Sequence, residues 1–450
     1  MSSSPSLQRD SLGNAITLGA PDSLSAIDDF VMGFIACEAR AVNILAVAHD
    51  PNPLVQAYCA ALHMFAESRD AVPNARPFIE RAQAGATRTT PREQRFIAAV
   101  AAWVDGDVPR AIALHHEQAR EFPRDLVSVK LGQYHCFNVG DGPGMLRLAL
   151  TARPDSADVA YVHGMTAFGF EQCHLMREAD ASARHAIALC RKEPWAHHAL
   201  SHVMLTEGRL TEGLTFMQAV SDSWTGLNSF MVTHNWWHVA LFLIDLGRDD
   251  EALAVYDRHV WGVVKAYSQD QIGAASLLAR FELAGIDVGE RWQDLAGHLT
   301  QRLDDHVLPF LDLQYLYGLA RAGRPEAHTL LHNIEAFAPQ APISTRAAWQ
   351  RVGVPAARGL LAHARGDHAA AIEALGQALP RLIDIGGSHA QRDLFEQVYL
   401  DALVRSGTRS TLTAAQGILQ QHRNGQPESL LLQRQGDAIH AALGLEIPVT

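Results

Sequence analysis

The chain has 450 residues, of which 48% are hydrophobic and 19% are charged, and its formal net charge at pH 7 is -12. These values are typical of a globular protein that is long enough to bury a large core. The acidic balance, without a dense basic cluster that could follow a phosphate backbone, argues against nucleic acid as a partner.

Cysteine usage and the N-terminal sequence indicate the compartment. The five cysteines, Cys37, Cys59, Cys136, Cys173 and Cys190, are an odd number without CxxC spacing, so neither a disulfide framework nor a thiolate zinc site is expected. The N-terminus lacks the basic residues and apolar run of a signal peptide, and no window approaches the roughly 18 apolar residues of a membrane span. We expect a cytoplasmic protein without a membrane partner.

The first predicted elements follow a flexible N-terminal arm. Residues 1–22 are polar with Gly and Pro, and amphipathic helices are expected over 23–48 and 53–66. Alternating apolar and polar runs joined by Asn-Gly or Asp-Gly hairpin turns are missing, whereas helical periods recur throughout, so the fold class is all-α. We predict a single continuous helical-repeat domain over residues 23–450.

A pattern of small residues recurs with a fixed period. Ala99 and Ala111 flank a turn at Gly106-Asp107, and the clearest repeats span residues 92–262. Stepping by about 34 residues, the period of a tetratricopeptide unit, reaches further turns and small positions at Gln133, Gly140-Asp141, Met145, Ala167, His174, Ala179, Ser201, Gly208 and Gly213. After a short insertion, the best unit follows at Trp236, Ala240, Gly247, Ala252 and Tyr256, and Gly359, Gly366-Asp367 and Ala371 repeat the pattern near the C-terminus.

This pattern is the tetratricopeptide signature, in which small residues let two antiparallel helices approach closely. It predicts an α-solenoid of helix pairs whose first helices line a concave surface. We expect this solenoid to curl around a central groove or pocket.

Two HxxxH pairs fall on the first helices of adjacent units. His198 and His202 form one pair, and His234 and His238 form the other. Residues four apart share a helix face, so the four imidazoles are expected to point into one space. An isolated groove histidine is usually solvated or hydrogen-bonded, but two such pairs on adjacent helices favour a ligand or catalytic role.

HxxxH is the helical spacing at which two imidazoles bind one metal ion, and zinc or iron is the expected metal. Glu171 or Asp245 would supply a carboxylate ligand. The metalloprotease form HExxH is absent, because neither pair carries Glu after its first histidine.

The repeat register places further side chains along the same groove. Glu171 and Gln172 take the equivalent positions one unit earlier, and Lys130 and Tyr134 take them one unit before that. Trp237 is expected beside the groove, and Lys130 is interpreted as a solvated charge rather than a Schiff-base lysine. No GxSxG, P-loop or GxGxxG motif followed by a strand supports serine hydrolase or nucleotide chemistry.

Five segments resemble the tetratricopeptide repeat protein 38 family. They are Tyr161-Val-His-Gly-Met-Thr-Ala-Phe-Gly-Phe170, the run 196–217, His234-Asn-Trp-Trp-His238, Arg291-Trp-Gln-Asp294 and Gly386-Gly-Ser-His-Ala-Gln-Arg-Asp393. The resemblance covers roughly residues 25–440 in the same order. It implies an all-helical repeat protein of a family found in bacteria and animals, and it implies no known reaction.

Carried over position by position, the resemblance retains both histidine pairs. The other retained positions are Asn235, Trp237, Asp305, His306, Asp312, Gly387, Ser388, Gln391, Arg392 and Asp393. His163, His197, Trp236 and His389 depart from the family pattern, so we do not expect these four to carry chemistry.

The Gly386–Asp393 segment has a physical interpretation of its own. Gly386 and Gly387 should end the preceding helix at Ile385, and Ser388 should cap the next one. Arg392 would then clamp a carboxylate or phosphate, or it would form an ion pair with Asp393 or Asp312.

Two functions remain from the sequence. The first is a small-molecule enzyme whose four histidines surround a metal ion or a reacting group. The residues expected to bind its substrate are Tyr134, Glu171, Trp237, Asp305, Asp312, Ser388, Gln391, Arg392 and Asp393. The second is a scaffold that binds a peptide or partner protein in the groove, and the richness of the groove in His and Trp modestly favours the first. The oligomeric state is left open.

Overall fold

In the computed structural model, the described residues, 7–20 and 22–445, are almost entirely in helices and the turns between them. The predicted all-α class is confirmed. The chain divides into two compact units. The first comprises the residues up to Leu200 together with Ser223–Met231, and the second comprises Ser201–Asp222 together with the chain from Val232 onward.

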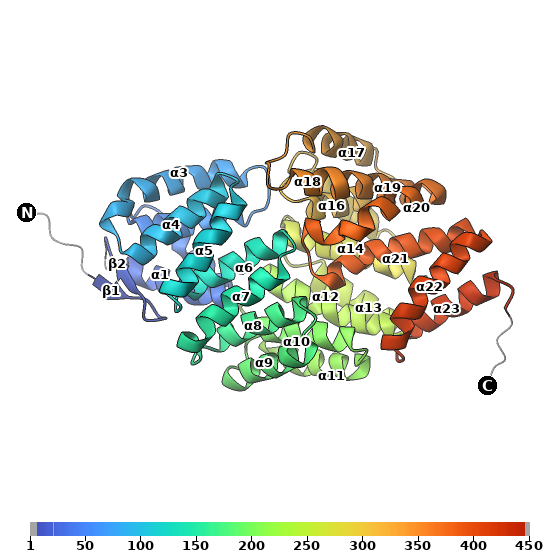
Figure 1. The fold of residues 1–450 in the computed structure, drawn as a ribbon, viewed down its shortest axis with the longest axis horizontal. Helices are drawn as coiled ribbons and strands as arrows, with labels where there is room; N and C mark the ends of the chain where they lie inside the picture. Colours follow the sequence, from blue (N-terminus) through green and yellow to red (C-terminus); the bar gives the residue numbers. More distant parts are fainter. Residues whose placement is uncertain (1–6, 21, 446–450) are drawn as a thin grey trace, which may run out of the picture. The chain divides into compact units, whose positions relative to one another are not determined.

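The first unit contains a small hairpin and a series of helices (Figure 1). Its elements are β1 (Leu7–Arg9), β2 (Ala15–Thr17), α1 (Ser23–Ile35), α2 (Pro53–Met64), α3 (Ala71–Gly85), α4 (Pro91–Val104), α5 (Val108–Glu121), α6 (Leu126–Asn138), α7 (Gly142–Ala152), α8 (Ala160–Gln172) and α9 (Met176–Leu189), with 3₁₀ segments at Ala39–Val47, Ala86–Arg88 and Arg153–Ser156.

Helix α10 (Pro194–Thr206) crosses from the first unit into the second. The later elements are α11 (Leu210–Val220), α12 (Ser229–Asp245), α13 (Asp249–Val255), α14 (Ser268–Leu283), α15 (Arg291–Leu299), α16 (Pro309–Arg321), α17 (Glu326–Phe337), α18 (Arg346–Ala348), α19 (Val354–Ala364), α20 (His368–Ala378), α21 (His389–Ser406), α22 (Arg409–Gly425) and α23 (Leu430–Ala442), with 3₁₀ segments at Ser221–Ser223 and Leu379–Ile385 and π-helical segments at Tyr256–Val260 and Trp349–Gly353.

The predicted repeat turns lie where the period places them. Residues with positive φ stand between the two helices of each pair, at Gly106, Gly140, His174, Gly208, Gly247 and Gly366. Left-handed backbone is the usual ending of a helix, and glycine is favoured there because it lacks a Cβ. His174, with φ of 57°, occupies the position that glycine fills in the other units.

Small residues at the helix contacts are buried, as the repeat requires. Ala99, Ala111, Ala240 and Ala252 are all 0–1% exposed. Where the pattern is poor, at Gln133, the side-chain amide donates to the backbone carbonyls of Met145 (2.9 Å) and Met165 (3.1 Å). The side-chain amide of Gln133 is therefore hydrogen-bonded to the backbone of α7 and α8, and the repeat tolerates it. These pairs form a tetratricopeptide-like α-solenoid.

The two helices of a pair differ in burial. Ten of the 13 residues of α8 are buried, on all of its faces, whereas α9 buries a stripe of four among its 14 residues. A helix that is covered all round belongs to a protein interior, and a helix with one apolar stripe lies on the surface. The first helix of this pair is interior and the second is external.

Part of the segment expected to be a flexible arm has regular structure. Strands β1 and β2 pair antiparallel, and Ile16 is fully buried. The backbone N–H and the hydroxyl of Thr17 both donate to the carboxylate of Glu93, at 2.9 Å each. Three-residue strands are too short to show an alternating pattern in the sequence. Residues 1–6 and 21 lie outside the described part of the chain.

No helix in the described part of the chain combines the length and apolar character that crossing a membrane requires.

Close helix packing at Gly213 predicts a specific sensitivity. A Cβ atom there would lie 2.3 Å from ring atoms of Phe242, so Gly213→Ala should lower the free energy of unfolding by about 1–3 kcal/mol. Chemical denaturation monitored by circular dichroism measures this loss. In the control, Gly297→Ala in α15, the new Cβ meets nothing within 4 Å, so stability should be unchanged or rise by up to about 1 kcal/mol. Equal effects of the two substitutions would contradict the packing argument.

Candidate functional site

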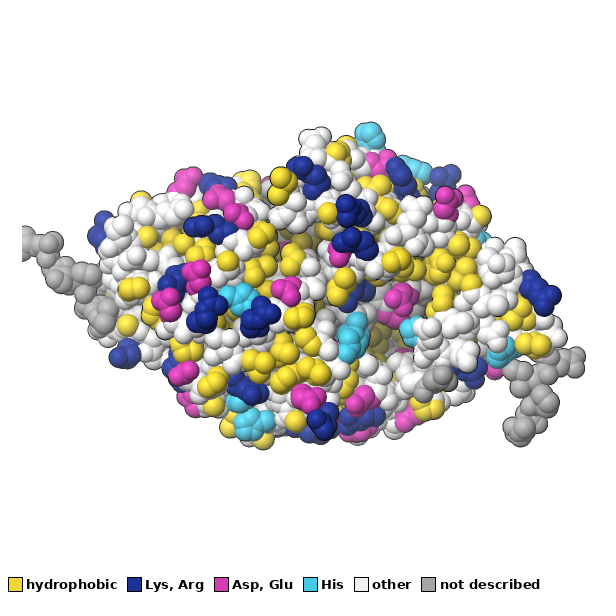
Figure 2. Space-filling view, in the orientation of Figure 1, with side chains coloured by type: hydrophobic (Ala, Val, Ile, Leu, Met, Phe, Trp, Pro, Cys, Tyr) yellow, Lys and Arg dark blue, Asp and Glu magenta, His cyan; other side chains and the backbone are white. Residues whose placement is uncertain are grey.

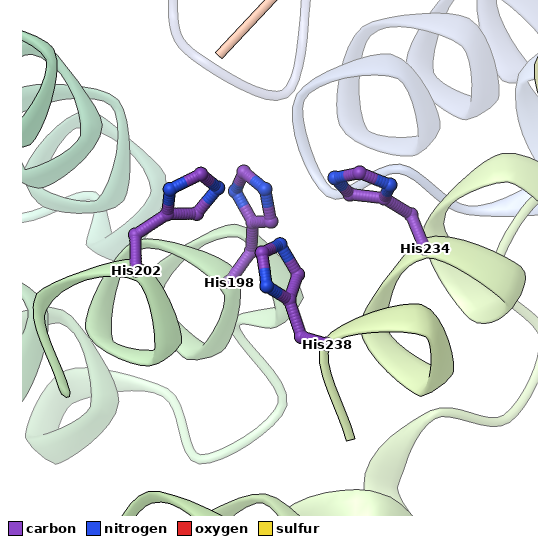
Figure 3. A group of neighbouring side chains, drawn as sticks. All are labelled: His198, His202, His234 and His238. Carbon is purple, nitrogen blue, oxygen red and sulfur yellow. The ribbon is translucent and has the colours of Figure 1, made fainter. Parts of the chain in front are cut away.

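Two helices bring the histidine pairs together. Helix α10 carries His198 and His202 one turn apart, and α12 does the same for His234 and His238. Figure 3 shows the four imidazoles gathered in one space, two from each helix. The boundary between the units falls inside α10, between Leu200 and Ser201. Three of the histidines belong to the second unit, and His198 precedes His202 in the same helix.

The four histidines are close enough to share an ion. Each offers one ring nitrogen, and these nitrogens all lie within 4.8 Å of one another. Zinc-bound imidazole nitrogens lie about 2.0–2.1 Å from the ion, so two of them are at most about 4.2 Å apart. In the tetrahedral geometry of zinc, four such nitrogens are about 3.4 Å apart, so the most distant pair in the cluster would have to approach by up to about 1.4 Å.

Burial and ring contacts define the surroundings of this cluster. His198, His202, His234 and His238 are 2%, 0%, 7% and 0% exposed. The ring centroids of His202 and His238 are 4.5 Å apart, and those of His234 and His238 are 4.9 Å apart. The ring of Trp237 stacks on His234 with an interplanar angle of 8°. These side chains are packed in the protein interior and do not line an open groove.

The electrostatic consequence is clearest at His234. Burial lowers the pKa of its imidazole to about 3, and the nearby His202 contributes to the lowering. The neutral imidazole is the form with a free lone pair for a metal ion, and it is the form present at neutral pH.

His389 adds a fifth imidazole beside the cluster. Its ring centroid lies 5.3 Å from that of His202, and it is the first residue of α21. Its departure from the family pattern led us to expect no role for it. Its proximity to His202 depends on how α21 packs, which local spacing does not reveal.

A cavity of about 520 Å³ lies in the second unit next to His389. Its apolar wall includes Leu205, Leu241, Leu400 and Leu432, and its polar wall includes Asp245, Arg280, His389, Arg392, Asp393 and Glu396. Figure 2 shows a hollow on this face of the molecule with acidic and histidine side chains at its edge. The combination of leucines and a few charged groups is typical of a small-molecule pocket.

Arg280 connects the wall of this cavity to the histidine cluster. Its guanidinium lies 5.5 Å from the ring centroid of Trp237, donates to the carbonyl of Ala390 (2.6 Å) and approaches Asp393 at 3.5 Å. Its Nε and Nη1 atoms are buried without a hydrogen-bond partner in the described part of the chain. Burial lowers the pKa of Arg280, while Asp393 and Asp245 oppose that effect.

A much smaller space lies beside His234 and Trp237. It has a volume of about 10 Å³, and His234, Trp237, Ser276, Gln314 and Gln391 are among its lining residues. This volume is about that of one water molecule. Gln391, a predicted site residue, therefore lies near His234 and Trp237.

Ser388 and Gln391 form a capping box at the start of α21. The hydroxyl of Ser388 accepts from the Gln391 N–H (3.2 Å), and the Gln391 side chain accepts from the Ser388 N–H (2.9 Å). The preceding 3₁₀ segment ends at Ile385, and Gly386 and Gly387 have positive φ. The predicted helix break and cap are confirmed. Because Ser388 caps its own helix, its hydroxyl is engaged in a structural contact.

Arg392 and Asp393 lie on the cavity wall. Their hydrogen-bond and ion-pair partners could not be predicted from their positions in the sequence. Arg392 donates to the backbone carbonyls of Gly386 and Gly387, which fixes the turn before α21. Asp393 approaches Arg280 and accepts from the side chain of Gln397.

Asp305 and Asp312 have partners within the helical framework. Asp305 forms an ion pair with Arg302 at 3.0 Å, and Asp312 hydrogen-bonds to His306 at 2.6 Å. Burial raises the pKa of Asp312 to about 6. The partner of Asp312 is therefore His306, and not Arg392 as one of the alternatives had it.

Tyr134 and Glu171 lie in the first unit. The Tyr134 hydroxyl donates to Glu67 (2.9 Å), and the carboxylate of Glu171, fully buried, accepts from the side chain of Gln172. Lys130 is not the solvated charge that we expected. Its ammonium donates to the carbonyl of Ile35 at 2.9 Å and lies within hydrogen-bonding distance of a cysteine sulfur.

Glu193 is a buried residue that belongs to none of the predicted motifs. It accepts from the backbone N–H of Ala196 at the start of α10, so it fixes the helix that carries the first histidine pair. Burial raises the pKa of Glu193 to about 8. In the sequence, an acidic residue directly before Pro194 indicates a helix start, and this pattern could have identified Glu193.

No family model matches the chain. Among solved structures, the human IFIT1 dimer with PPP-AAAA is similar with a TM-score of 0.42 and 11% sequence identity, over 92% of this chain and 95% of that chain. The structure of Naa15/Naa10 bound to HypK-THB is similar with a TM-score of 0.25 and 12% identity, over 95% of this chain and 69% of that chain. Similarity at this level carries no indication of function, so the chemistry of the site follows from its own geometry.

The half-buried carboxyl of Asp245 predicts a pH dependence of stability. It faces the cavity and accepts from Ser429 (2.6 Å), and burial together with Asp393 raises its pKa to about 6. Because the folded state binds this proton more tightly than the unfolded state, its contribution to stability rises as the pH falls from about 7 to 4. The unfolding temperature of the wild type relative to Asp245→Asn should therefore rise over this window, by an amount equivalent to about 1 kcal/mol. A difference that stays constant with pH would contradict the raised pKa.

Proposed function

We propose that His198, His202, His234 and His238 bind one divalent transition metal ion, zinc or iron, and that the adjacent cavity holds a small-molecule ligand or substrate. The observation that carries this proposal is the gathering of four buried ring nitrogens within 4.8 Å of one another. Neutral imidazole nitrogens are common ligands of zinc and iron, and four of them from two helices could bind one ion together.

The donor set limits the choice of metal. Imidazole nitrogen suits zinc, iron, copper and nickel, whereas calcium and magnesium prefer oxygen ligands. The five cysteines lie elsewhere in the chain, so no thiolate enters the set. A zinc ion held by all four histidines would have no open position, whereas an iron ion, which accepts more ligands, would keep a position at which it could polarise a carbonyl or lower the pKa of a coordinated water molecule.

The cavity supports the small-molecule part of the proposal. It adjoins the cluster through His389, whose ring contacts His202, and through Arg280, whose guanidinium covers Trp237. Its leucine wall would hold an apolar body, and Arg280 has buried N–H groups available for an acceptor on the ligand. His389 and Arg280 are thus the residues that would orient a ligand toward the metal.

A scaffold that binds a peptide or partner protein is the alternative. The burial of the histidine cluster, at 7% exposure or less, leaves no surface there for an extended peptide. A protein partner would instead have to contact the external helices, such as α9. The buried cluster therefore favours a metal and a small molecule.

We also propose that the chain belongs to the tetratricopeptide repeat protein 38 family and that residues 23–450 fold as one continuous domain. The five resembling segments support the family, and their order is retained. The unit boundaries fall inside α10 and α12, two uninterrupted helices, which supports a continuous fold.

Metal content tests the first part of the proposal. Tag-free protein should contain close to one equivalent of zinc or iron by inductively coupled plasma mass spectrometry. His202→Ala and His238→Ala should each lower metal occupancy at least tenfold, because the three histidines that remain would bind the ion much more weakly. Protein loaded with cobalt should show the visible absorption bands of a nitrogen-coordinated ion, and both variants should lose them.

The control for this experiment is His328→Ala, which removes an exposed histidine of α17. It should retain full occupancy. Folded wild-type protein that binds no metal, even after incubation with zinc, iron(II) or cobalt, would refute the metal centre.

A bulky substitution tests the cavity. Leu432 of α23 lines it, so Leu432→Trp should fill part of the volume and abolish the thermal shift of any compound that stabilises the wild type in a metabolite screen. Leu430→Trp is the matched control, since Leu430 is 40% exposed and is not part of the cavity wall. Compounds that stabilise both variants equally would place the ligand elsewhere.

A further inference from the structure

Lys130 and Cys37 form an unusually close pair in the first unit. The Nζ atom of Lys130, on α6, lies 2.9 Å from the Sγ atom of Cys37, which follows α1. Such a separation is normal between nitrogen and oxygen, but sulfur is the larger atom. At Cys59, also buried, the sulfur lies 3.7 Å from its partner, the carbonyl of Ile44.

The amine of Lys130 has a backbone carbonyl and two aromatic rings around it. Its other hydrogen bond goes to the carbonyl of Ile35 at 2.9 Å. The rings of Trp195 and Phe34 lie 5.3 Å and 5.8 Å from Nζ. These contacts hold the amine against the sulfur of Cys37.

The cysteine is held in an uncommon backbone conformation. Cys37 has φ of 56°, in the left-handed region that residues with a side chain seldom adopt. Its carbonyl accepts from the N–H of Asn228 (2.8 Å), and its own N–H donates to Phe34 (3.3 Å). The side chain is 5% exposed. Strained backbone persists where the surrounding contacts enforce it, and it marks positions with a specific role.

We propose that Lys130 and Cys37 are a covalent modification site, at which dioxygen inserts one oxygen atom between Nζ and Sγ to give an N–O–S bridge. The amine loses one hydrogen and the thiol loses one. Nitrogen and sulfur together give up four electrons, which reduce dioxygen. One of its oxygen atoms remains in the bridge, and the other leaves as water with the two hydrogens.

The bridge has a structural consequence. It joins the turn after α1 to α6, two segments separated by a long stretch of chain. A covalent link across a long loop restricts the unfolded chain and so stabilises the fold, by the same argument that applies to a disulfide. Reduction by excess thiol restores the amine and the thiol and removes this constraint.

Mass spectrometry of the full-length protein tests the proposal. Protein purified in air should be heavier than the same protein treated with dithiothreitol by about 14 Da, one oxygen gained and two hydrogens lost, in contrast with the larger gains of sulfenic and sulfinic acids. Proteolysis without reductant should yield one crosslinked peptide pair containing Lys130 and Cys37. Reduction should also lower the unfolding temperature by at least about 2 °C.

Matched variants locate the bridge. Cys37→Ser and Lys130→Arg should lack the reducible mass increase, and Lys130→Arg keeps the positive charge. Cys59→Ser, which removes a buried cysteine of the same unit, should retain it. The proposal would be overturned by wild-type protein that shows no reducible increase after incubation in oxygenated buffer, or by an increase that persists in Cys37→Ser. Because the first of these outcomes is measured on the wild type, it does not depend on how the variants fold.

Discussion

The burial of the first helix of a repeat pair on all of its faces is the constraint on which the rest of the structure depends. Each polar side chain on such a helix must find a partner inside the protein, because water does not reach it. Gln133 meets this requirement by donating to two backbone carbonyls, and Thr166 does so by donating to the carbonyl of Val162 one turn earlier. Histidine has fewer such options, since its second ring nitrogen needs either a donor or a metal.

The same constraint applies to the four histidines of the cluster. Four imidazoles on α10 and α12 lie almost out of contact with solvent, and aromatic rings surround them. The guanidinium of Arg280 lies over Trp237, whose ring stacks on His234. A cation bound by their neutral ring nitrogens is the occupant that we propose for this space.

The repeat architecture followed from the sequence because it depends on short-range features. Turn glycines recur at a fixed period, and an HxxxH pair has one geometry on any α-helix, so His202 and His238 could be placed on their faces without coordinates. The start of α21 was predictable for the same reason, since Ser388 and Gln391 form a local cap.

Features that depend on packing between distant segments could not be predicted in this way. The N-terminal hairpin is fixed by Glu93, and the cavity forms among helices from different parts of the second unit. Lys130 was taken for a solvated charge because its partner, Cys37, lies in the turn after the first helix. In each case the deciding contact joins residues that no sequence period relates.

The alternation between interior and external helices also bears on how this chain can change over evolutionary time. In α8 almost every position contacts other parts of the protein, whereas α9 presents most of its residues to solvent. Substitutions should therefore accumulate in the external helices and be rare in the interior helices, so that variable and constant segments alternate along the chain. The external helices could acquire new surface chemistry while the interior helices keep the buried histidines in register.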